Sequence, residues 1–279
     1  MTDTSSSPIT SVAQSSTPAQ NASNLLPPLL LLELRGTQIE IDRETLINLP
    51  ESVLIVMFPN GVILSKNPTS NLASPAHIIY VDFNPDMLHF VLSFYHSMED
   101  EKTNASFPDL SRLFGISSGP SSPFTGRRPF VILREELDYF TIPENQTPNH
   151  SPLKVACGQH LLKSSKIFDA FERNIHGGNN QAERQLVDML CLSGFNRGDE
   201  WGYRCIEPIR ATLVSISLVS LDASDQAIQS GVTQKLLLFW RKPARKCWWD
   251  IENVILDGTP NTPVKLWSRR IWTLELALI

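Results

Sequence analysis

One stretch of the sequence has the spacing of a phosphatase nucleophile. Five residues separate Cys191 from Arg197, as in cysteine phosphatases, where a thiolate attacks phosphorus while the arginine and the loop amides bind the phosphate oxygens. In those enzymes the loop follows a strand, whereas Cys191 ends a segment with a helical pattern. Leu190 replaces the usual histidine, and Gly198 replaces the hydroxyl that assists the leaving group. We therefore predict no catalytic residue and no enzyme activity, and keep a cysteine phosphatase as the least favoured hypothesis.

The other reactive residue types occur in patterns that have simpler explanations. Asp82 and Asp86 are joined by no second acidic cluster, and helix capping explains them. His89 and His96 share one face of a helix but have no third ligand beside them. The four cysteines are far apart, which fits neither a zinc site nor a disulfide framework. No glycine loop has the spacing or the lysine of a phosphate-binding loop. We expect no metal and no cofactor.

Basic and aromatic residues are interleaved near residue 240. Trp240 precedes four cations, of which the first is Arg241, and Trp248 and Trp249 follow them. Such a mixture can stack on nucleic-acid bases, anchor a protein interface, or form a hairpin tip with a turn at Pro243 and its rings in a core. The net charge of -5 and the pI near 5.7 argue against a nucleic-acid partner. We take Trp240, Arg241, Trp248 and Trp249 as candidate partner-binding residues, with a plain structural role as the alternative.

The first folded segment predicts a small α/β unit. Apolar residues alternate with polar ones across Gly36, which is typical of a hairpin with one buried face. Asp42 is placed to begin a helix that runs to Asn48, and Pro50 begins a second helix. A strand is expected over 78–83, followed by a helix that Asn84 caps.

Residues 131–143 predict a compact element that completes the first folded unit. We expect residues 131–133 to be extended and residues 134–140 to be helical, with Leu137 and Phe140 buried against Val91 and Leu92. Tyr139 would then lie at the edge of the unit, where a partner or a second copy could cover it. Tyr139 is therefore a further candidate partner-binding residue.

The second half of the chain has a different pattern. Residues 153–174 and 181–192 predict two amphipathic helices, and four later segments resemble strands: 212–221, 235–240, 247–256 and 271–279. The fold class is thus α+β. We divide the chain into a disordered Ser/Thr-rich tail (1–29), an α/β unit (30–145) with a disordered insert at about 99–129, and a C-terminal α+β domain (153–279).

Three stretches of the first unit resemble a BTB/POZ domain of the potassium-channel-tetramerisation-like kind. They are residues 33–54, 79–96 and 132–143, which give in order a strand–turn–strand with a capped helix, the pattern D-F-x-P-x-x-F/L-x-x-V-L-x-F, and the pattern L-x-E-E-x-x-Y-F-x-I. The resemblance implies that this unit self-associates or docks a partner. The commonest other use of such a domain is as a substrate receptor for a cullin-based ubiquitin ligase, which we keep as the alternative function.

The whole arrangement resembles the fungal growth and stress regulators of the Whi type. These proteins have a Ser/Thr-rich N-terminus, one BTB-like domain with a loop insert, and a C-terminal domain containing tryptophans. The resemblance implies a non-enzymatic adaptor that works with a plasma-membrane aspartyl phosphatase in the stress response and restrains target-of-rapamycin signalling. No stretch reaches the ~20 apolar residues of a membrane span. We therefore expect a soluble cytoplasmic protein that a partner can recruit to the plasma membrane.

Overall fold

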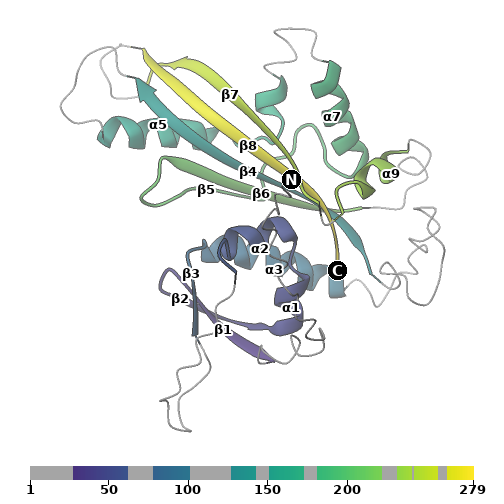
Figure 1. Ribbon diagram of the computed structural model, residues 1–279. Coiled ribbons are helices and arrows are strands. Elements are labelled where there is room, and N and C mark those ends of the chain that lie inside the picture. Colours follow the sequence, from purple (N-terminus) through teal and green to yellow (C-terminus); the bar gives the residue numbers. More distant parts are fainter. Residues whose placement is uncertain are drawn as a thin grey trace, which may run out of the picture.

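The protein contains two β-sheets with helices between and around them (Figure 1). The computed structural model describes residues 28–61, 78–100, 127–142, 151–172, 181–221, 231–240, 242–256 and 263–279. Within them lie a three-stranded mixed sheet and a five-stranded antiparallel sheet, which confirms the α+β class. No helix in these ranges is long and apolar enough to cross a membrane.

The small sheet is built on the predicted hairpin. β1 (Leu29–Leu34) and β2 (Thr37–Asp42) are antiparallel, and β3 (Ile78–Val81) adds to β1 in parallel. The two turn residues, Arg35 and Gly36, both have left-handed backbone angles, as a two-residue turn that matches the twist of the strands requires. The hairpin prediction is confirmed.

Three helices of this unit lie between the small sheet and the large one (Figure 1). They are α1 (Arg43–Asn48), α2 (Glu51–Met57) and α3 (Pro85–Asp100), in agreement with the sequence patterns. The side-chain oxygen of Asn84 accepts hydrogen bonds from the backbone N–H groups of Asp86 (2.9 Å) and Met87 (3.2 Å), so the predicted cap of α3 is confirmed. Asp42 precedes α1 but makes no such bond.

The large sheet has the order β5-β6-β4-β8-β7. Its strands are β4 (Pro129–Ile142), β5 (Tyr203–Ile206), β6 (Thr212–Ser220), β7 (Ala244–Val254) and β8 (Val264–Leu278). One face carries three helices: α5 (Ser151–Lys163), α7 (Gln181–Leu192) and α9 (Val232–Leu237). The helices of the small unit cover one end of the opposite face, where Phe130 and Ile132 join the core of that unit.

The prediction of a helix over residues 134–140 is wrong, whereas residues 131–133 are extended as predicted. All of them belong to β4, a strand of 14 residues that pairs with β6 on one side and β8 on the other. The charged residues 134–136 favoured a helix in isolation, but the two neighbouring strands supply hydrogen bonds along most of the segment. Residues 129–142, which we assigned to the first unit, therefore belong to the large sheet.

The strand also reverses the predicted exposure of two aromatic residues, since Phe140 was expected to be buried and Tyr139 to lie at the edge of the unit. Successive side chains of a strand point to opposite faces, so Tyr139 and Phe140 cannot behave as neighbours on a helix do. Tyr139 is 4% exposed and packs under α5, whereas Phe140 is 50% exposed on the other face. Leu137 is buried as expected, but against Cys157 and Leu161 of α5 instead of α3.

Two further differences concern the second half. Residues 235–240 were predicted as a strand, but α9 occupies Val232–Leu237, because Leu236 fills the core as part of a helical turn over β8. The first helix ends at Lys163, where the chain turns so that Lys166 bridges to Glu200. The helix over 181–192 and the strands around 212–221, 247–256 and 271–279 are confirmed. Most of the predicted tail and insert, residues 1–27 and 101–126, lies outside the described residues.

Candidate protein-interaction site

Aromatic and aliphatic side chains, all exposed except the partly buried Trp267, gather on the face of the large sheet that carries no helix from the second half. We call this group the aromatic surface: Phe140, Ile142, Trp249, Ile251 and Trp267, from β4, β7 and β8. Phe140 and Ile251 both pair across strands with Trp267, which places the three side chains side by side. The ring centroid of Trp249 lies 5.9 Å from that of Phe140 and 6.4 Å from that of Trp267.

The length of β4 explains why this surface is uncovered. Phe130 is buried beneath the helices of the small unit, with Tyr95 of α3 against its ring at 5.6 Å. At the usual rise per residue, Ile142 lies about 40 Å further along the strand. The helices of the small unit pack at the Phe130 end of β4 (Figure 1), and four members of the aromatic surface at the other end are 49–55% exposed. An apolar cluster of this kind on a sheet face is typical of an interaction site.

Cations border the aromatic surface. The Lys265 ammonium lies 5.7 Å from the centroid of the Trp267 ring, a cation–π distance. Two N–H groups of the Arg269 guanidinium donate to one carboxylate oxygen of Asp138, and the other oxygen accepts a hydrogen bond from the Thr212 hydroxyl (2.8 Å). The indole N–H of Trp267 is buried without an acceptor among the described residues. The surface thus combines apolar area with the positive charge of Lys265 and an ion pair at its border.

The predicted partner-binding residues do not form one site. Trp249 belongs to the aromatic surface, but Trp248 points to the other face, where its ring packs against Phe171 and Trp272 at 4.8 and 5.7 Å. Tyr139 is also buried on that helix-covered face. Tyr139 is therefore a core residue and Trp248 a partly buried one that packs against the core, because adjacent positions in a strand face opposite ways. Arg241 lies outside the described residues.

Four members of the aromatic surface were not predicted from the sequence: Phe140, Ile142, Ile251 and Trp267. Their signal is apolar alternation, since Phe140 and Ile142, like Trp249 and Ile251, are two positions apart. The helical interpretation of residues 134–140 concealed it.

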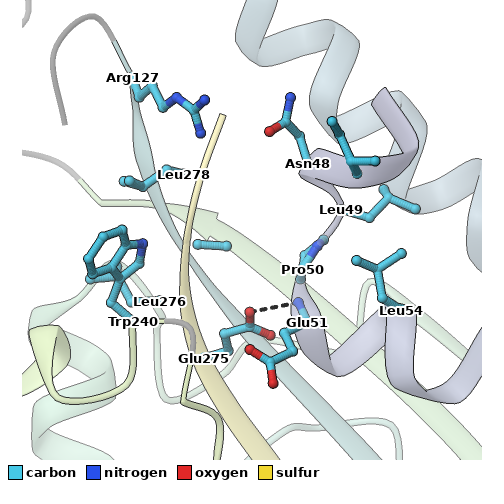
Figure 2. Close-up of a pocket in the computed structure, with 12 residues that line it drawn as sticks. Asn48, Leu49, Pro50, Glu51, Leu54, Arg127, Trp240, Glu275, Leu276 and Leu278 are labelled. Carbon is cyan, nitrogen blue, oxygen red and sulfur yellow. Dashed lines mark hydrogen bonds between the residues drawn. The ribbon is translucent and has the colours of Figure 1, made fainter. Parts of the chain in front are cut away.

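Trp240 lies in a pocket of about 250 Å³ at the junction of the small unit and β8 (Figure 2). At its base Glu275 of β8 is buried, and its two carboxylate oxygens accept hydrogen bonds from the backbone N–H groups of Glu51 (2.8 Å) and Ser52 (2.9 Å). These groups begin α2, so a residue of the large sheet caps a helix of the small unit. Burial raises the pKa of Glu275, although the bonds from Ser52 and Glu51 act to lower it.

The helix-covered face of the large sheet encloses a charged cluster. Glu135 is buried and accepts hydrogen bonds from Arg204 (2.6 Å), Arg270 (3.0 Å) and the indole of Trp272 (2.9 Å). Burial alone would raise the pKa of Glu135, but Arg270, Arg204 and Trp272 together lower it. The cluster lies between the packing of α7 and that of α5, where it fixes β4 against β8 and β5.

The loop from Cys191 to Arg197 has the geometry of a helix end. The N–H groups of Gly194 and Phe195 bond to the carbonyls of Cys191 and Leu190, and that of Asn196 bonds to the Asp199 side chain. They are therefore not directed at a common anion. The Arg197 guanidinium pairs with Asp188 at 2.6 Å. Burial raises the pKa of Cys191 despite the nearby charge of Arg197, which disfavours the thiolate a nucleophile needs.

The described residues contain no group of three His, Cys, Asp or Glu side chains placed to hold a metal ion.

Comparison with known proteins decides the family. A WHI2-like protein of Schizosaccharomyces pombe is 35% identical over 271 aligned residues, covering 91% of this chain and 88% of the relative. The chain belongs to the WHI2-like family. A growth regulation protein of Saccharomyces cerevisiae is 23% identical, over 90% of this chain and 91% of its own length. A second Schizosaccharomyces pombe protein, uncharacterized, is 27% identical over 91% of this chain and 88% of its own length. No family model matches the chain.

The WHI2-like assignment confirms the Whi-type resemblance at the level of the family and of growth regulation. The matches extend over both sheets, so the two units described above occur together in the relatives.

Proposed function

We propose that this WHI2-like protein is a non-enzymatic adaptor that controls growth in the stress response by bringing a protein phosphatase to its targets. The observation that carries the proposal is the aromatic surface, an exposed apolar group with a cationic border in a chain of the growth-regulation family. Tryptophan and arginine are the commonest anchors of protein interfaces. The helix-end geometry of the Cys191 loop supports a role without catalysis.

In this proposal the small unit is BTB/POZ-like and the phosphatase is a plasma-membrane aspartyl phosphatase. Recruitment by that partner would bring the chain to the membrane and restrain target-of-rapamycin signalling when nutrients are scarce. The hairpin and helices of residues 29–57 and the strand and helix of residues 78–100 support the BTB-like assignment, although the third stretch of the resemblance, residues 132–143, belongs to the large sheet. The growth-regulation relative supports a role in growth control.

Affinity purification of the full chain from stressed and unstressed cells tests the proposal. The wild type should recover a phosphatase, and Phe140→Asp should lose it, because a charge at the centre of the aromatic surface removes apolar contact area while leaving the core intact. Tyr80→Asp is the matched control, since Tyr80 is an exposed aromatic residue on β3, in the other sheet. Recovery of a cullin without a phosphatase would instead support the ubiquitin-ligase alternative.

A direct assay addresses the enzymatic alternative. The purified protein should not hydrolyse a generic aryl phosphate above background. Hydrolysis that disappears in Cys191→Ser would overturn the adaptor proposal.

A further inference from the structure

The outer edge of β7 has the features of a strand that pairs with another strand. β7 is the last strand of the large sheet, and no strand in the described ranges lies beyond it. It has 11 residues, about twice the usual length, and contains no proline. Its exposed positions alternate strictly with half-buried ones from Ala244 to Asn253. Natural proteins usually protect such an edge with a short strand, a bulge, a proline or charged side chains, and of these β7 has only the charges.

Charge is distributed unevenly along this strand. The first half carries Arg245 and Lys246, and the second half carries Asp250 and Glu252. Two such strands that run antiparallel set the basic half of one against the acidic half of the other, whereas a parallel pair would align like charges. The pattern is therefore complementary to itself in the antiparallel arrangement.

We propose that two copies of this chain associate through β7, joining their large sheets into one ten-stranded sheet about a two-fold axis at Trp249. In this register Trp249 lies opposite Trp249 of the second copy, and Cys247 lies opposite Ile251. Lys246 lies opposite Glu252 twice, once on each side of the axis. Paired residues of an antiparallel sheet share a face, so the tryptophans meet on the aromatic surface and the ion pairs form on the helix-covered face.

Neighbouring registers fit less well. A shift that centres the axis on Asp250 places two carboxylates together, and one that centres it on Cys247 removes both Lys246–Glu252 pairs. An axis on Trp248 would set Lys246 opposite Asp250, but Asp250 already lies 3.8 Å from Arg270, and Trp248 is packed against Trp272 of the core. Lys246 and Glu252 have partners within the chain, Glu183 at 3.0 Å and His160 at 3.9 Å, but their side chains stay 37% and 27% exposed. Both can thus reach across the edge.

The inference goes beyond the proposed function and does not depend on it, because the purified chain alone suffices for its test. Phe140 and Ile142, which lie two strands away from the edge, stay available to an unlike partner in the paired state.

The test is sedimentation of the full chain over a series of concentrations. Wild type should form a dimer, and Trp249→Glu should be monomeric at every concentration, because it places two carboxylates on the axis. Tyr80→Glu, on the edge strand of the small sheet, is the matched control and should dimerise like the wild type. Circular dichroism confirms that each variant is folded.

A charge exchange tests the register itself. Lys246→Glu and Glu252→Lys should each weaken the dimer on the order of tenfold, since each places like charges opposite one another twice. A mixture of the two variants should associate as tightly as wild type, because both ion pairs are restored between unlike copies. A purely structural role of either residue would not produce this recovery.

Three outcomes overturn the proposal: a wild-type chain that is monomeric throughout, a dimer that survives Trp249→Glu, or a dimer lost in Tyr80→Glu alone. The last result would place association in the small unit. A monomeric chain that still recovers a phosphatase would leave the proposed function standing and end this inference.

Discussion

Glu135 shows how one buried carboxylate holds three strands. It joins Arg204 of β5 and Arg270 of β8 to β4, and all three side chains are at most 5% exposed. Glu135→Gln leaves two buried guanidinium groups without a counter-charge, so it should destabilise the protein by about 3–5 kcal/mol. Urea unfolding measures the loss. A variant as stable as the wild type would mean that water replaces the carboxylate.

The acid stability of the wild type should depend on the same residue. The folded-state pKa of Glu135 lies below its unfolded value, so the stabilisation is complete above the unfolded pKa and is lost as the pH falls through the folded pKa. Glu135→Gln should therefore flatten the acid limb of a plot of unfolding free energy against pH. An unchanged slope would assign acid denaturation to other carboxylates.

The effect of Glu275 on the pH dependence of stability has the opposite sign to that of Glu135. Its folded-state pKa is raised, so the folded state binds the extra proton, and its contribution is greatest at low pH and falls as the pH rises through the raised value. Glu275→Ala removes both acceptors from the start of α2 and should cost about 2–4 kcal/mol. Glu275→Gln keeps one acceptor and no charge, and should cost clearly less. Thermal unfolding at neutral pH separates the two; equal losses would contradict the capping role.

Tyr139 and Phe140 are a further pair of neighbours with opposite roles. Tyr139→Ala should destabilise the chain by about 3–5 kcal/mol, because it empties a buried site between β4 and α5. Phe140→Ala should cost less than about 1 kcal/mol, since the ring is half exposed. Melting temperatures of both variants check this order, and the reverse order would restore the helical interpretation of residues 134–140.

At the scale of the elements, Gly158 sets the distance between α5 and the sheet. A Cβ there would lie 2.5 Å from the Tyr139 hydroxyl oxygen. Gly158→Ala should therefore destabilise by about 1–3 kcal/mol, although alanine favours a helix. Gly198→Ala, where no atom lies within 4 Å, is the control and should change little. Adding Tyr139→Phe to Gly158→Ala should recover part of the loss; no recovery would show that the hydroxyl is not the obstacle.

The elements also show what the sequence could predict. Local signals found the hairpin at Gly36, the Asn84 cap and most helices, because each depends on residues close in the chain. β4 was missed since its stability comes from partners about 80 and 130 residues away. Of the predicted interaction residues, only Trp249 lies on the aromatic surface, because the division of Trp248 and Trp249 between two faces depends on the strand register.

At the scale of the whole molecule, the two sheets share a core. Phe130, Ile132, Ile216 and Ala277 of the large sheet pack into the same cluster as Val53 and Met87 of the small unit. We expect one cooperative unfolding transition. All six tryptophans lie at position 201 or later, so their fluorescence reports on the second half, while far-ultraviolet circular dichroism reports on the whole chain. The two urea curves should coincide; separate midpoints would show that the small unit folds independently.

The place of β8 in the large sheet has a consequence for biosynthesis. β8 lies between β4 and β7, yet of the five strands it is the last to leave the ribosome. Until it emerges, β7 has no strand to join, Glu135 has only one of its two arginines, and α2 lacks its cap from Glu275. A premature stop codon upstream of residue 264 would therefore remove an inner strand of the sheet, on which β7 depends, and not merely an edge strand. Such an allele should behave as a complete loss of the gene, through degradation of the unfinished chain.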